Sequence, residues 1–272
     1  MIACYNGATS HPYPLEEDLR AAAQAGFTMV ELWGEKFDRF FDKHTLDDLK
    51  RLLDCHKLEV AAIDLIPLDY SQPQGVDQAV ERARDLGKIA QAVGCDLLLL
   101  CSWGDLHGRS KEEGIALVAE YLGPVCAAAA ESCCRLAIEP LGGHEVISGC
   151  EEALAVIERA QQSNLGLMWD FFHYHKSRVP LETIRRIPPD KLWLVHVDDA
   201  PDRPPETLTD PDRLYPGTGA MPLTTYFQIL RDLGYKGPVS VELFNPDYYR
   251  QPIDDIAHNA YRSLQPFLRG EA

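Results

Sequence analysis

Four residues that can bind a divalent metal ion each follow a short apolar run in the sequence. Glu139 closes the run LAIE and Asp170 closes LGLMWD, while His196 follows WLV and Glu242 follows VSV. A buried carboxylate is costly unless it is paired or bound to a metal ion, so packing alone does not explain these acids. Any one of them could cap a helix or pair with an arginine, but four at equivalent positions favour a shared site.

Three carboxylates and one imidazole make a mostly hard set of ligands. Such a set suits Mn²⁺, Mg²⁺ or Co²⁺, and also Zn²⁺, so we expect one divalent metal ion as cofactor. No thiolate belongs to the set, which disfavours a structural zinc site.

The apolar runs alternate with helical patterns along the whole chain, and runs of this length are typical of strands buried on both faces. Strands are predicted at Ile2–Asn6, Phe27–Trp33, Leu58–Leu65, Cys95–Cys101, Leu136–Glu139, Leu165–Asp170, Leu192–Val197 and Val239–Leu243. Helices are predicted at 15–26, Leu46–His56, Val76–Val93, Lys111–Ser132, Glu151–Gln161, Leu181–Ile187, Pro222–Leu233 and Ile253–Leu268. This alternation predicts an α/β fold with a parallel sheet, and eight units in 272 residues fit a single (β/α)₈ TIM barrel domain over residues 1–272.

In such a barrel the active site lies at the C-terminal ends of the strands. The four candidate ligands end strands five to eight, and neighbouring strands lie only ~4.8 Å apart, so their side chains can converge on one ion. A doubly wound open sheet is the alternative fold. The sequence does not support a doubly wound dinucleotide-binding domain, because no GxGxxG motif follows the first strand.

Charge and composition limit the class of partner. The net charge is −16, with 42 acidic and 26 basic residues, and such a surface repels nucleic acid and anionic lipid. The eight cysteines form no CxxC pair and fit buried free thiols in a reducing compartment. We find no signal peptide and no apolar stretch as long as a membrane span. We therefore expect a cytoplasmic protein that binds a small polyol ketone or sugar and neither nucleic acid nor membrane, while its oligomeric state stays open.

Five stretches extend the pattern beyond the metal ligands. With them the chain resembles the xylose isomerase-like barrels of the sugar isomerase and epimerase group, and within these the inosose isomerases (2-keto-myo-inositol isomerases). The matching stretches are CYNGATS near the start, DFFHYH, HVDD, DRLYPGTG and VSVELFNPDYY. The last two are the most specific, because metal binding alone would not require them.

This resemblance implies an enzyme, an isomerase of inositol catabolism. It would shift the carbonyl of an inosose by 1,2 proton transfer through a cis-enediolate, with the metal ion acting as a Lewis acid. It implies that Glu139 and Glu242 are the catalytic acid–base pair as well as metal ligands. It also implies that His173, three residues after Asp170, binds a substrate hydroxyl.

Other polar residues on the expected rim are predicted to contact the substrate. Asp198 follows the seventh strand and would contact the substrate or orient a ligand. Arg213 could clamp a substrate oxygen. It lies in the long loop Pro201–Gly219, which is a candidate lid. Glu31 and Asp64 end strands two and three and are interpreted as rim acids that suit a polyol.

Several other functions would use the same ligands. A ketose 3-epimerase or sugar isomerase needs the same ion and glutamates, and an inosose or dehydroshikimate dehydratase would expel a hydroxyl group instead of returning the proton. An AP endonuclease is disfavoured by the net charge and by Asp64, which stands where such enzymes carry a histidine. A non-catalytic metal-binding module is disfavoured by the two glutamates in the acid–base positions.

Overall fold

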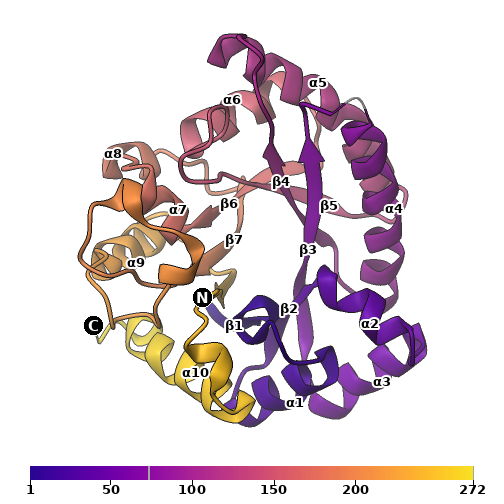
Figure 1. The fold of residues 1–272 in the computed structure, drawn as a ribbon, viewed down its shortest axis with the longest axis vertical. Coiled ribbons are helices and arrows are strands. Elements are labelled where there is room, and N and C mark those ends of the chain that lie inside the picture. The colour runs from indigo at the N-terminus through magenta and orange to yellow at the C-terminus, as the bar shows by residue number, and fades with distance from the viewer. Residues whose placement is uncertain (73, 272) are drawn as a thin grey trace.

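The computed structural model describes residues 1–72 and 74–271. Its eight strands are all parallel and close into a barrel in the order of the sequence, which confirms the predicted fold class (Figure 1). The strands are β1 (Ile2–Asn6), β2 (Met29–Trp33), β3 (Glu59–Asp69), β4 (Leu97–Trp103), β5 (Arg135–Glu139), β6 (Leu165–Asp170), β7 (Leu192–Val197) and β8 (Pro238–Val241).

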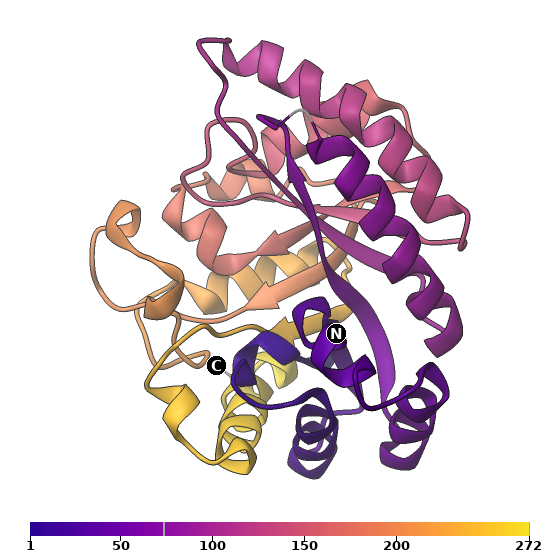
Figure 2. The ribbon, with the colours of Figure 1, turned by 45° about the vertical axis from the view of Figure 1, so that its right-hand side comes forward.

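Helices form a ring outside the barrel, as the two views of the ribbon show (Figure 1 and Figure 2). They are α1 (Leu15–Ala25), α2 (Phe37–Phe41), α3 (Leu46–His56), α4 (Gly75–Val93), α5 (Lys111–Ala130), α6 (Cys150–Ala160), α7 (Phe171–Lys176), α8 (Leu181–Ile184), α9 (Leu223–Asp232) and α10 (Ile253–Arg269). The longer helices show the expected end signals. Ser110 and Thr45 form capping boxes at the starts of α5 and α3, and Gly26 and Gly94 end α1 and α4 in the left-handed conformation.

The apolar core has two layers that follow from the period of two along each strand. Outward-facing side chains pack against the helices in one large cluster. Inward-facing side chains fill the lower part of the barrel in a second, smaller cluster made of Ala62, Leu97, Leu99, Ala137, Met168 and Leu194. The polar residues of the next layer lie directly above this inner cluster, which forms the apolar floor of the site.

Near the site the structure differs from the predicted elements in the end of one strand and in two short helices that were not predicted. β3 extends to Asp69, four residues beyond the predicted end, so Asp64 lies within this strand rather than at its tip. The short helix α7 begins immediately after Asp170, in a stretch that carried no prediction of a helix. A further short helix, α2, follows β2. Each short helix is only one or two turns long, too short to show a periodic apolar pattern.

One helix in the described residues, α5, is long and apolar enough to cross a membrane by length and composition alone. The expectation that no stretch of this kind exists is therefore wrong. In the structure α5 lies in the helical ring between α4 and α6 and packs against both of them. Half of its most apolar stretch is buried there, and a core helix of a soluble barrel passes the same test.

Candidate metal centre

Side chains along a strand alternate between the inside and the outside of the barrel, and this alternation places the candidate ligands inside. On β5, β6 and β7 the inner-cluster residues Ala137, Met168 and Leu194 are each followed two positions later by a candidate ligand. Two residues along a strand return a side chain to the same face, so these ligands form the layer directly above the apolar floor. Glu242 comes immediately after β8 and lies close to these three ligands.

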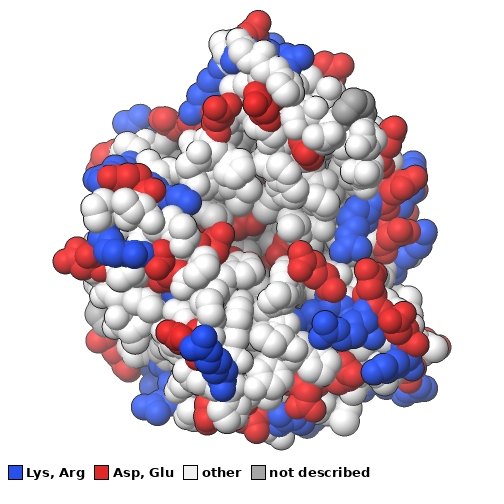
Figure 3. All heavy atoms as spheres, in the orientation of Figure 1, with Lys and Arg blue, Asp and Glu red and all other residues white. Residues whose placement is uncertain are grey.

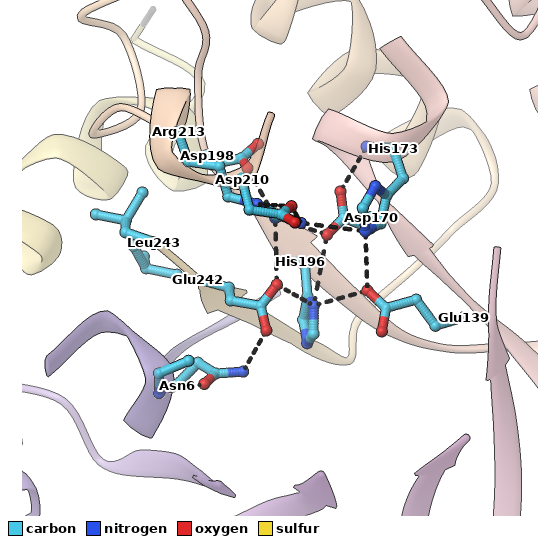
Figure 4. A network of polar contacts seen from close by, with 12 residues as sticks. Asn6, Glu139, Asp170, His173, His196, Asp198, Asp210, Arg213, Glu242 and Leu243 are labelled. Carbon is cyan, nitrogen blue, oxygen red and sulfur yellow. Dashed lines mark hydrogen bonds and ion pairs between the residues drawn. The ribbon is translucent and has the colours of Figure 1, made fainter. Parts of the chain in front are cut away.

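Glu139, Asp170, His196 and Glu242 converge as predicted (Figure 4). Each offers one ligand atom, and these atoms all lie within 4.8 Å of one another. His196 Nδ1 is 3.5 Å from Glu139 Oε1, 3.7 Å from Asp170 Oδ2 and 3.1 Å from Glu242 Oε2. Ligands bound at about 2.1 Å in a tetrahedron stand about 3.4 Å apart, so the spacing suits one divalent ion.

The imidazole of His196 gives the clearest test of whether a metal ion fits here. Its Nε2 lies 3.0 Å from each carboxylate oxygen of Glu31. A proton on Nε2 satisfies that carboxylate and leaves Nδ1 as a bare nitrogen. Nδ1 is buried and has no hydrogen-bond partner although it faces three carboxylates. A buried acceptor of this kind, surrounded by anionic oxygens, fits a bound cation.

The electrostatics of the cluster also favour positive charge at this point. Burial alone would lower the pKa of His196, but the surrounding carboxylates, Glu242 and Glu31 first among them, outweigh it and hold that pKa well above its usual value. Without a metal ion the ring therefore favours a second proton on Nδ1, at the place where a cation would bind. Burial would likewise raise the pKa of Asp170, but Arg213 and His173 outweigh it and keep that pKa well below its usual value. These surroundings favour the ionised form of Asp170, which is the form that binds a metal ion.

Arg213 comes from the long loop and reaches the centre of this cluster. Its side chain is 1% exposed, and Nη1 donates to Asp170 Oδ2 at 2.8 Å and to Asp198 Oδ2 at 2.9 Å. Nη1 also lies 3.2 Å from Glu242 Oε2. Its guanidinium lies over the ring of Phe172, with 4.7 Å between the guanidinium carbon and the ring centroid. Arg213 is thus committed to protein carboxylates, and a contact with substrate remains a prediction.

The loop that delivers Arg213 is anchored by Asp199. Both oxygens of this carboxylate accept backbone N–H groups: Ala200 N and Met221 N at Oδ1, and Gly217 N and Gly219 N at Oδ2, at 2.8 to 3.0 Å. Gly217 has a φ of +81°, and a Cβ at Gly219 would come within 2.2 Å of the carbonyl oxygen of Ala200. The PGTG sequence therefore folds tightly around Asp199, and this end of the candidate lid is fixed over the site.

A cavity of about 230 Å³ opens above the cluster. Figure 3 shows acidic side chains at the bottom of a hollow near the middle of this face. The lining residues are Trp33, Glu35, Asp64, Leu65, Cys101, Trp103, Glu139, Leu141, His173, Asp210, Arg213, Glu242 and Phe244. A larger cavity of about 560 Å³ lies elsewhere, between α6 and residues 186–191, and includes none of the cluster residues.

The two acids expected on the rim have different surroundings from those predicted. Glu31 is not on the rim: it lies in the middle of β2 with a fully buried side chain and contacts His196 from below the site. Asp64 lines the cavity, and its Oδ1 is buried without a hydrogen-bond partner. The β3–β4 register gains one residue on β3 between Ile63 and Ile66, and an irregularity of this kind redirects a side chain. Burial and the carboxylates of Glu31, Glu139 and Glu242 raise the pKa of Asp64 well above its usual value.

His173 and Asp198 both lie next to the centre. His173 lines the cavity, its Nε2 is 3.2 Å from Arg213 Nη2 and 4.0 Å from Glu139 Oε1, and its Nδ1 has no partner. Asp198 is fully buried under Arg213 and does not line the cavity, so it orients the guanidinium. His175, the second histidine of DFFHYH, is half-buried and is neither in the cluster nor in the cavity lining.

Sequence reasoning missed several residues that shape this site, and three of them lie next to the two glutamates. Cys101 and Asn6 contact the two glutamates, and Phe244 forms a wall of the cavity. Cys101 and Asn6 close the predicted fourth and first strands, so extending the comparison of strand ends to neutral residues would have found them. Phe244 stands two residues after Glu242, within the VSVELFNPDYY stretch.

Comparison with known proteins gives one family. Residues 19–269 match the xylose isomerase-like TIM barrel family. The chain is 26% identical over 269 residues to the inosose isomerase of Bacillus velezensis, covering 97% of this chain and 96% of that protein. It is 30% identical over 257 residues to the 3-dehydroshikimate dehydratase of Pseudomonas aeruginosa, but covers only 39% of that protein. In structure it resembles the IolI protein crystallised with a zinc atom, with a TM-score of 0.93, 24% identity and coverage of 100% of this chain and 99% of that one.

Proposed function

The chain belongs to the xylose isomerase-like TIM barrel family, and we propose that it is an inosose isomerase of inositol catabolism. It shifts the carbonyl group of 2-keto-myo-inositol to the neighbouring carbon by 1,2 proton transfer. Glu139, Asp170, His196 and Glu242 are the proposed metal ligands. The observation that carries this proposal is the pair of glutamates, each with one oxygen facing the same imidazole nitrogen across a small polar cavity.

The two glutamates supply the proton transfer. A divalent ion held by the four ligands would polarise the ketone and make the adjacent C–H more acidic. One glutamate takes that proton, and the substrate becomes an enediolate. A proton then returns to the carbon that carried the carbonyl. The proton of the neighbouring hydroxyl moves to the former carbonyl oxygen, so that this hydroxyl becomes the new ketone and atoms and charge balance. Asp170, held ionised by Arg213, has no part in this transfer.

The charges of the cavity favour a neutral substrate. Among the described residues that line it, Arg213 is the one guanidinium and there is no lysine. Arg213 is already paired with Asp170 and Asp198, whereas Glu35 and Asp210 add acidic groups around the opening. A carboxylate substrate, such as 3-dehydroshikimate, would find no free cation of the protein here. This favours the isomerase over the dehydratase.

The cavity walls suit a cyclic polyol. Trp33, Trp103 and Phe244 offer apolar surface to the C–H faces of a ring, while His173 and Asp64 offer polar groups to its hydroxyls. The unpartnered atoms, Nδ1 of His173 and Oδ1 of Asp64, are the proposed hydroxyl contacts. A ketose 3-epimerase remains the second candidate, because an open-chain ketohexose also offers neighbouring carbonyl and hydroxyl groups.

Proton NMR in D₂O tests the proposal with the zinc-loaded protein. We expect 2-keto-myo-inositol to gain deuterium next to the carbonyl and to give a new ketone isomer. D-psicose and 3-dehydroshikimate serve as comparison substrates. Exchange of D-psicose alone would make the protein an epimerase, and loss of water from either cyclic ketone would make it a dehydratase. Inertness toward all three would overturn the proposal.

A further inference from the structure

Each proposed acid–base glutamate has one carboxylate oxygen held by a neutral side chain. Cys101 Sγ on β4 donates to Glu139 Oε2 at 2.9 Å. Asn6 Nδ2 at the end of β1 donates to Glu242 Oε1 at 3.2 Å, as Figure 4 shows. Cys101 is 5% exposed and Asn6 is fully buried, so both contacts lie almost entirely inside the protein.

The order of strands in the barrel explains why these two residues have matching places. The proposed ligands occupy β5 to β8, and the strands on either side of that arc are β4 and β1. Cys101 is the direct register partner of Glu139. Tyr5 pairs with Val241, so Asn6 stands beside Glu242 one position farther along. Each end of the arc therefore has one donor from the next strand round the barrel.

In each glutamate one carboxylate oxygen accepts from the neutral donor, and the other oxygen faces Nδ1 of His196. With Oε2 of Glu139 held by Cys101, Oε1 lies 3.5 Å from His196 Nδ1. With Oε1 of Glu242 held by Asn6, Oε2 lies 3.1 Å from the same nitrogen. Neither donor carries a charge, so each can fix the direction of a carboxylate without neutralising it.

We propose that Cys101 and Asn6 are positioning residues that hold Glu139 and Glu242 in the orientation needed for proton transfer. A glutamate side chain has several rotatable bonds, and a misplacement of about 1 Å can cost roughly a hundredfold in rate. Loss of a partner that orients a metal ligand typically costs about 10–100-fold in metal affinity or activity. The part of this inference that concerns proton transfer rests on the proposed function.

Cys101→Ala tests the first contact, because it removes the donor and little else. We expect kcat to fall about 10–100-fold and zinc binding to weaken by a similar factor, with KM changed by less than about threefold. Cys101→Ser restores a donor and should recover most of both losses. Cys126→Ala is the matched control, since it removes a buried thiol from α5, outside the site.

Asn6→Asp tests the second contact in the same way. The new carboxylate keeps the oxygen that accepts from Ala8 N at 2.7 Å but has no N–H group to offer Glu242. We expect kcat to fall by a similar factor. Zinc affinity is compared in the Cys101 variants alone, because a new carboxylate beside Glu242 would itself attract the ion. Asn164→Asp is the matched control, because Asn164 precedes β6 at the other end of the barrel and donates to Cys126 O and Cys134 O.

Zinc affinity, measured calorimetrically on metal-free protein, keeps this test independent of the substrate. Losses in the alanine variant that serine recovers, and that the controls lack, support the inference. Unchanged kcat and zinc affinity would overturn it. Equal losses in the alanine and serine variants, or losses that follow a fall in melting temperature, would also overturn it. If the wild-type protein turns over no ketone, the proposed function fails, and the comparison of zinc affinities still decides the inference.

Discussion

At the scale of single residues, His196 divides its two nitrogens between two tasks. Its Nε2 lies 3.0 Å from both oxygens of Glu31, and its Nδ1 faces the carboxylates of the cluster. The carboxylate of Glu31 fixes the ring and its tautomer, so Nδ1 is free to act as a ligand. Glu31 therefore serves the site from below and does not need to meet the substrate.

Glu242→Gln tests the assignment of proton transfer to a glutamate. The amide has nearly the same shape but cannot accept the proton, so we expect the fold to persist and deuterium exchange into the ketone to fall about 10²–10⁴-fold. Proton NMR measures that exchange. Glu120→Gln, on the exposed face of α5, is the control and should exchange at the wild-type rate. Near-normal turnover by Glu242→Gln would contradict the mechanism.

Asp64 gives a prediction for pH. Its pKa in the folded protein is raised by burial, Glu31, Glu139 and Glu242, so the folded state binds its proton more tightly than the unfolded state. Stability from this group is therefore present at low pH and is lost as pH rises between the unfolded and folded pKa values.

In metal-free protein, Asp64→Asn should gain stability relative to wild type as pH rises through that window. The slope is at most about 1.4 kcal/mol per pH unit. Urea unfolding at a series of pH values measures the difference. A difference that stays constant from acidic to neutral pH would show that Asp64 is not held protonated.

The residue types that sequence reasoning could identify were those whose chemistry conflicts with a buried strand. Glu139, Asp170 and Glu242 stand out as acids after apolar runs, and the structure brings them together in one cluster with His196. Cys101 could not be identified in this way, because a thiol at the end of LLLLC is also common in a packed apolar core. Glu31 was recognised as a candidate, but its contact with His196 spans the barrel and depends on closure of the sheet.

At the scale of elements, the regular parts of the barrel were predictable and the irregular parts were not. Period and apolar runs gave eight strands, all of which are present. The extra residue of β3 between Ile63 and Ile66 depends on how this strand pairs with β4, so it cannot be predicted from the local sequence of β3. The same holds for the loop Pro201–Gly219, whose conformation depends on backbone contacts to Asp199.

Asp199→Asn should loosen that loop. Each oxygen of Asp199 accepts two backbone N–H groups, and an asparagine offers only one such oxygen. The loss of two buried contacts should cost roughly 2–4 kcal/mol of unfolding free energy, measured in urea. Amide hydrogen exchange in residues 209–219 should accelerate as well. Asp202→Asn, an exposed change in the same loop, is the control, and equal exchange in the two variants would contradict this role.

At the scale of the whole molecule, the barrel joins distant parts of the chain in one site. Asn6 contacts Glu242, 236 positions away, across the seam where β1 and β8 close the sheet. A ligand bound at this point therefore links both ends of the sequence. Binding to the folded state alone should stabilise the entire fold, because the unfolded chain has no such site.

Zinc should accordingly raise the melting temperature. Free Zn²⁺ at a hundred times its dissociation constant adds about 2.7 kcal/mol, which is a shift of roughly 5–10 °C for a chain of this size. Differential scanning calorimetry measures it, and Asp170→Asn should abolish most of the shift. Asp190→Asn, an exposed change outside the site, should leave it intact. A shift of equal size in both variants would place the ion elsewhere.

The most direct test of the central claim is the position of the ion. Anomalous diffraction from zinc-loaded crystals, recorded on both sides of the zinc absorption edge, locates it without reference to any substrate. We predict one strong peak enclosed by Glu139, Asp170, Glu242 and the Nδ1 atom of His196. A peak outside this cluster, or a fully loaded protein with no peak within it, would contradict the account.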